Sequence, residues 1–117
     1  MMKIQIRERN AEVTEVLRAH VERRLGIALG RFGERVGHVI VRFSDTNGHQ
    51  DGANKRCQID VSLRPRSVRV EDTDADLFAA VDHAADRVSR SVARALEREL
   101  ERDEGPIGTR TSGGSKT

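Results

Sequence analysis

Four arginines recur three or four residues apart toward the end of the chain: Arg87, Arg90, Arg94 and Arg98. On a helix, which turns about 100° per residue, this spacing gathers them on one flank, with His83 among them. The acidic residues of the same segment fall on the opposite flank: Asp82, Asp86 and Glu97. A row of guanidinium groups suits a row of phosphates, because the planar fork of arginine matches phosphate oxygens. The alternative is ion pairing on a solvated helix, Asp86 with Arg90 and Glu97 with Arg94.

Other basic residues could extend such a surface. Arg24 is unusual because its angular position lies within the apolar stripe of its own helix. A buried, unpaired arginine is costly, so its side chain must reach solvent or a phosphate. We expect Arg24 in the groove between two helices, close to the arginine row, where it contacts RNA or simply extends to solvent. The remaining candidates for RNA contact are Arg23, Arg31, Lys55 and Arg56.

Residues typical of catalytic or metal sites do not form a recognisable set. The four histidines have no ligand spacing to one another or to the single cysteine, Cys57, which takes an inward position on a strand. Asp72, Asp74 and Asp76 resemble the start of a calcium loop, but the sixth position is not glycine and the twelfth is not glutamate. We interpret these three residues as helix caps. We therefore expect no enzyme, no cofactor, no metal ion and no small-molecule substrate.

Composition narrows the class of protein. The 117 residues make one domain, and the net charge of +2 is informative only if charges segregate in space. The absence of Trp and Tyr argues against base stacking as the main mode of recognition. One cysteine fits a reducing compartment, and neither a secretory leader nor a membrane span is recognisable. We expect a cytoplasmic protein without membrane contact.

The elements that must position these residues follow from periodicity. Period-two alternation predicts strands, and apolar residues at helical spacing predict two helices. The expected elements are a strand over 1–10, a helix from Thr14 to about Gly33, strands over 38–44 and 56–64, a short strand at Val68–Val70, and a helix from about 76 to 102. Gly26 and Gly30 indicate either close approach of another element or fraying. This order predicts a two-layer α+β domain over 1–104, with both helices on one face of a four-stranded sheet, and a flexible tail over 105–117.

Two sequence runs resemble a known family. The run VTEVLR at 13–18 opens the first helix and DLFAAVD at 76–82 opens the second. With the β-α-β-β-β-α order, they resemble the ribosome hibernation promoting factors, also called ribosome-associated translation inhibitors or sigma-54 modulation proteins, in their short form. The resemblance covers roughly residues 2 to 100, and the second run is the more specific.

The resemblance implies a fold like that of the double-stranded-RNA-binding domain. It also implies binding to the small ribosomal subunit in the decoding region, where the protein blocks tRNA and mRNA under stress. Two other functions stay open from the residues: a free-standing binder of double-stranded RNA, and a protein-interaction module that uses the open sheet face or the helices.

Overall fold

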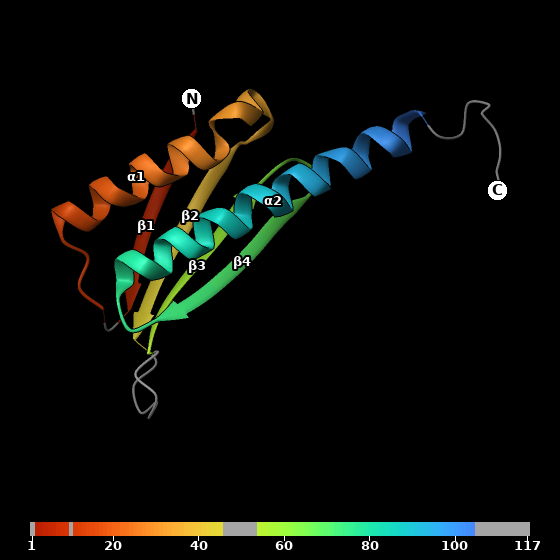
Figure 1. Cartoon of the computed structure of the whole chain (residues 1–117). Helices are drawn as coiled ribbons and strands as arrows, with labels where there is room; N and C mark the ends of the chain where they lie inside the picture. Colours follow the sequence, from red (N-terminus) through yellow and green to blue (C-terminus); the bar gives the residue numbers. More distant parts are fainter. Residues whose placement is uncertain (1, 10, 46–53, 105–117) are drawn as a thin grey trace.

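The computed structural model describes residues 2–9, 11–45 and 54–104, with side chains described up to residue 100. It is a four-stranded sheet with two helices on one face (Figure 1). The elements are β1 (Lys3–Arg9), α1 (Glu15–Leu29), the 3-10 helix η1 (Gly30–Arg35), β2 (His38–Asp45), β3 (Lys55–Ser62), β4 (Ser67–Asp74) and α2 (Leu77–Glu104). The predicted two-layer α+β class is confirmed. Residues 46–53, between the two central strands, and the expected tail (105–117) lie outside the described residues.

The sheet has the strand order β1-β2-β3-β4. β1 pairs in parallel with β2, and the other neighbours are antiparallel. Because directly paired residues point to the same side of a sheet, the register divides the side chains between two faces. One row on the helix face is Ile6, Val41, Ile59 and Val70. The adjacent row on the open face is Arg7, Arg42, Gln58 and Glu71.

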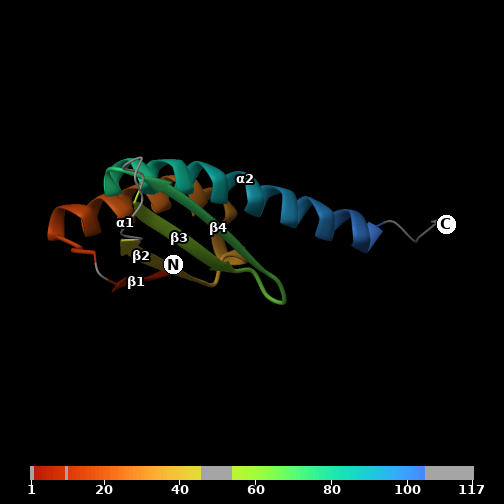
Figure 2. The ribbon, with the colours of Figure 1, turned by 90° about the horizontal axis from the view of Figure 1, so that it is seen from below.

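The core lies between the sheet and the helices, which Figure 2 shows on the same side of the sheet. It is aliphatic, as the composition predicts, and Phe43 is its one fully buried aromatic side chain among the described residues. The alternating residues Cys57, Ile59 and Val61 of β3 are fully buried, which confirms the predicted inward face of that strand. α1 lies above β1 and β2, and α2 crosses β3 and β4 (Figure 1).

The predicted cap of α1 is confirmed, but its predicted end is wrong. The Thr14 side chain accepts a hydrogen bond of 3.1 Å from the backbone N–H of Leu17. The α-helix ends at Leu29, and the chain continues as a tight turn in which Gly33 has a φ of 58°. A Cβ added at Gly26 or Gly30 would meet nothing within 4 Å, so no element approaches these glycines closely.

β4 is longer than predicted, and this corrects the interpretation of the aspartates. Thr73 and Asp74 belong to the strand, as does Asp72, whose side chain points to the helix face beside Cys57. Of the expected caps, Asp76 accepts a hydrogen bond from the N–H of Phe78, while Asp74 accepts one from the N–H of Asp76. The local pattern of Asp72–Asp76 resembled caps because aspartate is rare inside strands.

α2 runs beyond the sheet to Glu104, two residues past the predicted end. Its buried stripe includes the predicted residues Val81, Ala84, Val88, Val92 and Ala95. Among the helices of the described part, none has the length and apolar character needed to cross a membrane.

Candidate nucleic-acid interface

The arginine row of α2 lies along the edge strand β4, as the side chains Arg87, Arg90 and Arg94 show. These residues line a groove of about 490 Å³ between α2 and β4. Arg69 of β4 and Ser91 of α2 also line the groove and supply hydrogen-bond donors. The groove therefore brings together four guanidinium groups from two elements.

Within the described residues, Arg87 is the one member of the row that is held by an acidic residue. Its Nε lies 3.1 Å from Oδ2 of Asp72, whose side chain is only 18% exposed. Asp72 also lies 4.0 Å from Nδ1 of His83, which is equally distant from Asp74. This contact fixes the start of the row against β4.

Arg90, Arg94 and Arg98 are exposed and have no carboxylate partner within the described residues. Neither of the ion pairs considered from the sequence, Asp86 with Arg90 and Glu97 with Arg94, is present in this part of the chain. Asp86 instead lies 3.3 Å from Arg24 of α1. The three arginines are thus available to an external anion, over about two turns of helix.

Arg24 does not lie close to the arginine row, which corrects the sequence-based expectation. It lies in the seam between the helices, but on the acidic flank of α2. Its Nε donates to Oδ1 of Asp82 at 3.0 Å and its Nη2 to Asp86 at 3.3 Å. The relative rotation of the two helices decides which flank of α2 faces α1, and no local pattern encodes that rotation.

The candidates Arg23 of α1 and Arg31 of η1 also contact groups in or near this seam. Arg23 donates to Nδ1 of His20 at 3.3 Å, and Arg31 donates to Ser89 of α2 at 3.1 Å. The guanidinium of Arg31 also lies 4.6 Å from the centroid of the Phe32 ring. These contacts orient both side chains on the helix layer.

The candidates Lys55 and Arg56, at the start of β3, lie at one end of the sheet and do not join the groove. Lys55 donates to Asp45 at 2.7 Å, and Arg56 lies 3.8 Å from Glu71. Arg56 points to the open face, because it pairs in register with Ser44 and Thr73. The candidate residues therefore divide among three places: the α2–β4 groove, the helix seam and the sheet end.

The sequence analysis missed a second group of arginines on the open face. Arg7 and Arg9 of β1 and Arg42 of β2 lie close to Arg56, around one hollow. Their outward positions follow from alternation, which is a signal the sequence does contain. Their proximity depends on the parallel β1–β2 register, which it does not reveal.

The seam also sets the electrostatics of Asp82. Desolvation alone would raise the pKa of this carboxyl group. The hydrogen bond from His20 and the positive charge of Arg24 outweigh desolvation, and the pKa lies below its usual value. Asp82 is therefore ionised at neutral pH and links the two helices.

Cys57 lies in the core, and its thiol is not activated. Burial, with the negative charge of Asp72, raises the pKa of the Cys57 thiol to about 12, so it is a poor nucleophile at neutral pH. Over the residues that the structure describes, no three His, Cys, Asp or Glu side chains gather as metal ligands would.

Comparison with known proteins finds a matching family and similar proteins. Residues 4–100 match the model of the family described as sigma 54 modulation protein / S30EA ribosomal protein. The chain is 30% identical over 89 residues to the ribosome hibernation promotion factor of Lactococcus lactis, covering 74% of this chain and 45% of that protein. The Deinococcus radiodurans protein of the same name is 29% identical over 86 residues, covering 74% and 44%. The chain thus spans less than half the length of these relatives.

Two solved structures are also similar. The N-terminal domain of Protein Y from Thermus thermophilus has 34% identity and a TM-score of 0.65, covering 80% of this chain and 98% of that domain. A ribosomal subunit interface protein from Coxiella burnetii has a TM-score of 0.68 over 83% of this chain and 99% of its own. At 15% identity, the second comparison bears on the fold alone.

Proposed function

The chain belongs to the sigma 54 modulation protein / S30EA ribosomal protein family, and we propose from this membership that it is a ribosome hibernation factor that binds the small ribosomal subunit. It occupies the decoding region, contacts ribosomal RNA through the α2–β4 groove, and blocks tRNA and mRNA under stress. It acts in the cytoplasm, where ribosomes are.

The observation that carries this proposal is the row Arg90, Arg94 and Arg98. These side chains are exposed along one flank of α2 and make no ion pair within the described part of the chain. Guanidinium groups that lack internal partners are free to bind phosphate oxygens, each displacing counterions from the RNA. The beginning of the row is fixed by the contact of Arg87 with Asp72.

The composition supports recognition by shape and charge rather than by base sequence. Without Trp or Tyr, and with Phe43 buried in the core, the chain has few rings on which bases can stack. Folded RNA offers a fixed arrangement of phosphates, which arginines spaced along one helix can match. Inhibition then needs no chemistry, because a bound domain excludes other ligands from the same volume.

Two of the comparisons support a ribosomal partner. The matched relatives are named ribosome hibernation promotion factors. The Protein Y domain, at 34% identity, is covered almost completely by this chain. The described part of this chain thus corresponds to the N-terminal domain of that protein.

Sedimentation with purified particles tests the proposal. The protein is mixed at one fixed salt concentration with small subunits, large subunits or a naked RNA duplex. We expect it to pellet with small subunits and to bind the duplex at least tenfold more weakly. We also expect it not to pellet with small subunits that already hold mRNA and tRNA. Equal affinity for the duplex would favour a free-standing double-stranded RNA binder instead. Failure to bind any of the three would favour a protein-interaction module.

A further inference from the structure

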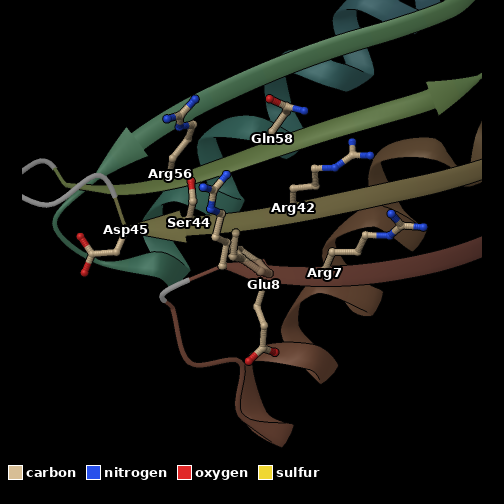
Figure 3. A pocket seen from close by; sticks show the side chains of 9 residues that line it. Arg7, Glu8, Arg42, Ser44, Asp45, Arg56 and Gln58 are labelled. Atoms are coloured by element: carbon tan, nitrogen blue, oxygen red, sulfur yellow. The ribbon is translucent and has the colours of Figure 1, made fainter.

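The open face of the sheet, which no helix covers, carries a second basic surface. Its hollow of about 560 Å³ lies where β1 ends and β3 begins. Four arginines from three adjacent strands line it, together with two neutral polar residues: Arg7, Arg9, Arg42, Arg56, Ser44 and Gln58. Figure 3 shows Arg7, Arg42 and Arg56 rising from the same side of the sheet. We call this set the sheet-face hollow.

The strand register forces these positive charges together. Arg7 pairs directly with Arg42, and Arg9 pairs with Ser44, which in turn faces Arg56 on β3. Like charges directly opposite each other on neighbouring strands destabilise a sheet. Arg7 and Arg9 are exposed and form no ion pair among the described residues. The folded state therefore contains a repulsion that a bound anion would relieve.

Nearby acids orient this cluster without neutralising it. Asp60 accepts hydrogen bonds from Arg42 at 2.6 Å and from Gln58 at 3.3 Å, which holds the Arg42 guanidinium in one place. Asp60 is shared, because it also accepts from Arg69 at 2.5 Å. Among the described residues, Arg56 has one carboxylate partner, Glu71, at 3.8 Å.

Two acids, Glu8 and Asp45, also line the hollow, and they do not compensate the cluster either. Asp45 binds Lys55 at 2.7 Å, and Figure 3 shows the carboxylate of Glu8 pointing away from the guanidinium groups. The excess of positive charge in the sheet-face hollow is thus directed at solvent.

We propose that the sheet-face hollow is a second phosphate-binding surface, which takes the backbone of an RNA strand. This rests on the proposed function, since it assumes that the protein meets RNA. A base would find no ring to stack on here, because Phe43 is 1% exposed. A peptide would find no aromatic or large aliphatic side chain to anchor on. Phosphates need neither, and arginine forks suit them.

The two basic surfaces are neighbours across β3 and β4. Glu71 lines the α2–β4 groove and lies 3.8 Å from Arg56 of the sheet-face hollow. Arg69 of the groove and Arg42 of the hollow both bind Asp60. The variants that test the inference therefore remove charge from each surface separately.

Oligonucleotide binding by paired variants tests this inference. The probe is a fluorescent oligouridylate, whose affinity is measured by anisotropy over a series of salt concentrations. Arg7→Gln with Arg9→Gln removes two charges from the sheet-face hollow, and Arg90→Gln with Arg94→Gln removes two from the groove. Arg18→Gln with Arg66→Gln is the matched control, because both lie outside the two surfaces and make no ion pair within the described residues.

We expect the hollow variant to bind at least tenfold more weakly than the control. We also expect its slope of log K against log salt to flatten by about 1.4, since each single-strand phosphate contact contributes roughly 0.7. Its thermal midpoint should equal or exceed that of the wild type, because repulsion with Arg42 is relieved.

The outcomes separate this inference from the proposed function. If the hollow variant binds like the control while the groove variant is weakened, the inference is overturned and the groove stands. If only the hollow variant loses affinity for oligouridylate, the inference stands and the proposed RNA contact at the α2–β4 groove is wrong. A polyglutamate peptide is the last arm: if it competes for the hollow as strongly as oligouridylate does, the site is one for acidic peptides and the phosphate assignment is overturned.

Discussion

Arg24 of α1 and Asp82 of α2 are joined by a hydrogen bond of 3.0 Å between Nε and Oδ1. The same Oδ1 lies 2.8 Å from Nε2 of His20, and the His20 ring packs against Phe78 at 5.1 Å. Arg24 and Asp82 are 58 positions apart in the sequence, so this contact joins two helices that are distant along the chain. It also determines which flank of α2 is left for an outside partner, namely the arginine flank.

The first prediction concerns Asp82, whose pKa is lowered in the folded state. A lowered pKa means that its contribution to stability is present above about pH 4 and is lost as the pH falls through the folded-state value. Asp82→Asn should cost about 1 kcal/mol at pH 7, a modest figure because the side chain is 45% exposed. Urea unfolding at pH 7 and pH 3 checks this. An equal difference between variant and wild type at both pH values would contradict it.

The second prediction separates stability from binding at Arg24. This residue was a candidate for RNA contact, but its guanidinium is occupied by Asp82 and Asp86. Arg24→Gln should lower the free energy of unfolding by about 1 kcal/mol and change ribosome affinity by less than threefold. Denaturation and pelleting assays measure the two effects. A large loss of affinity in a stable Arg24→Gln protein would restore Arg24 as an RNA contact.

The third prediction uses two glycines of the first helical region. Gly26 lies within α1 with open space around its Cβ position, so Gly26→Ala should stabilise the protein by about 0.5–1 kcal/mol. Gly33 has a φ of 58°, which disfavours any side chain, and Gly33→Ala should destabilise by about 1–2 kcal/mol. Opposite signs in thermal unfolding are expected. Destabilisation by Gly26→Ala would mean that something does pack there.

The fourth prediction concerns Cys57. The side chain is fully buried and its pKa is about 12, so only roughly 10⁻⁴ of the thiol is ionised at pH 8. We expect Ellman's reagent to label it slowly in the native protein and rapidly in urea. Cys57→Ser should cost about 1–3 kcal/mol, because it buries a poorly paired hydroxyl. Rapid native labelling would contradict the register of β3.

Local patterns predicted most of the fold. Alternation predicted that Val39, Val41 and Phe43 point inward, and helical spacing predicted the same for Val88 and Val92. Both predictions work because burial of one face imposes a period on each element. The end of α1 was missed because the apolar helical spacing continues to Phe32, whereas the α-helix itself ends at Leu29. The length of β4 was missed because Asp72 is stabilised by Arg87 of another element.

The site was less predictable than the fold, since it depends on relations between elements. The arginine flank of α2 followed from angular arithmetic on one helix. The pairing of Arg24 with Asp82 requires the rotation of two helices, and the meeting of Arg7 with Arg42 requires the parallel register of β1 and β2. Neither relation has a local signature in the sequence.

The central claim is that the exposed arginines of α2 hold the protein on the small ribosomal subunit. Arg87 pairs with Asp72, so its reversal would also disturb the fold, and the cleanest variant is Arg90→Glu with Arg94→Glu. The control reverses Arg18 and Arg66, and circular dichroism verifies that all three proteins are folded. We predict that titration of small subunits at one fixed salt concentration gives a loss of at least a hundredfold for the α2 variant and less than threefold for the control. Undiminished binding by the folded α2 variant would contradict the account.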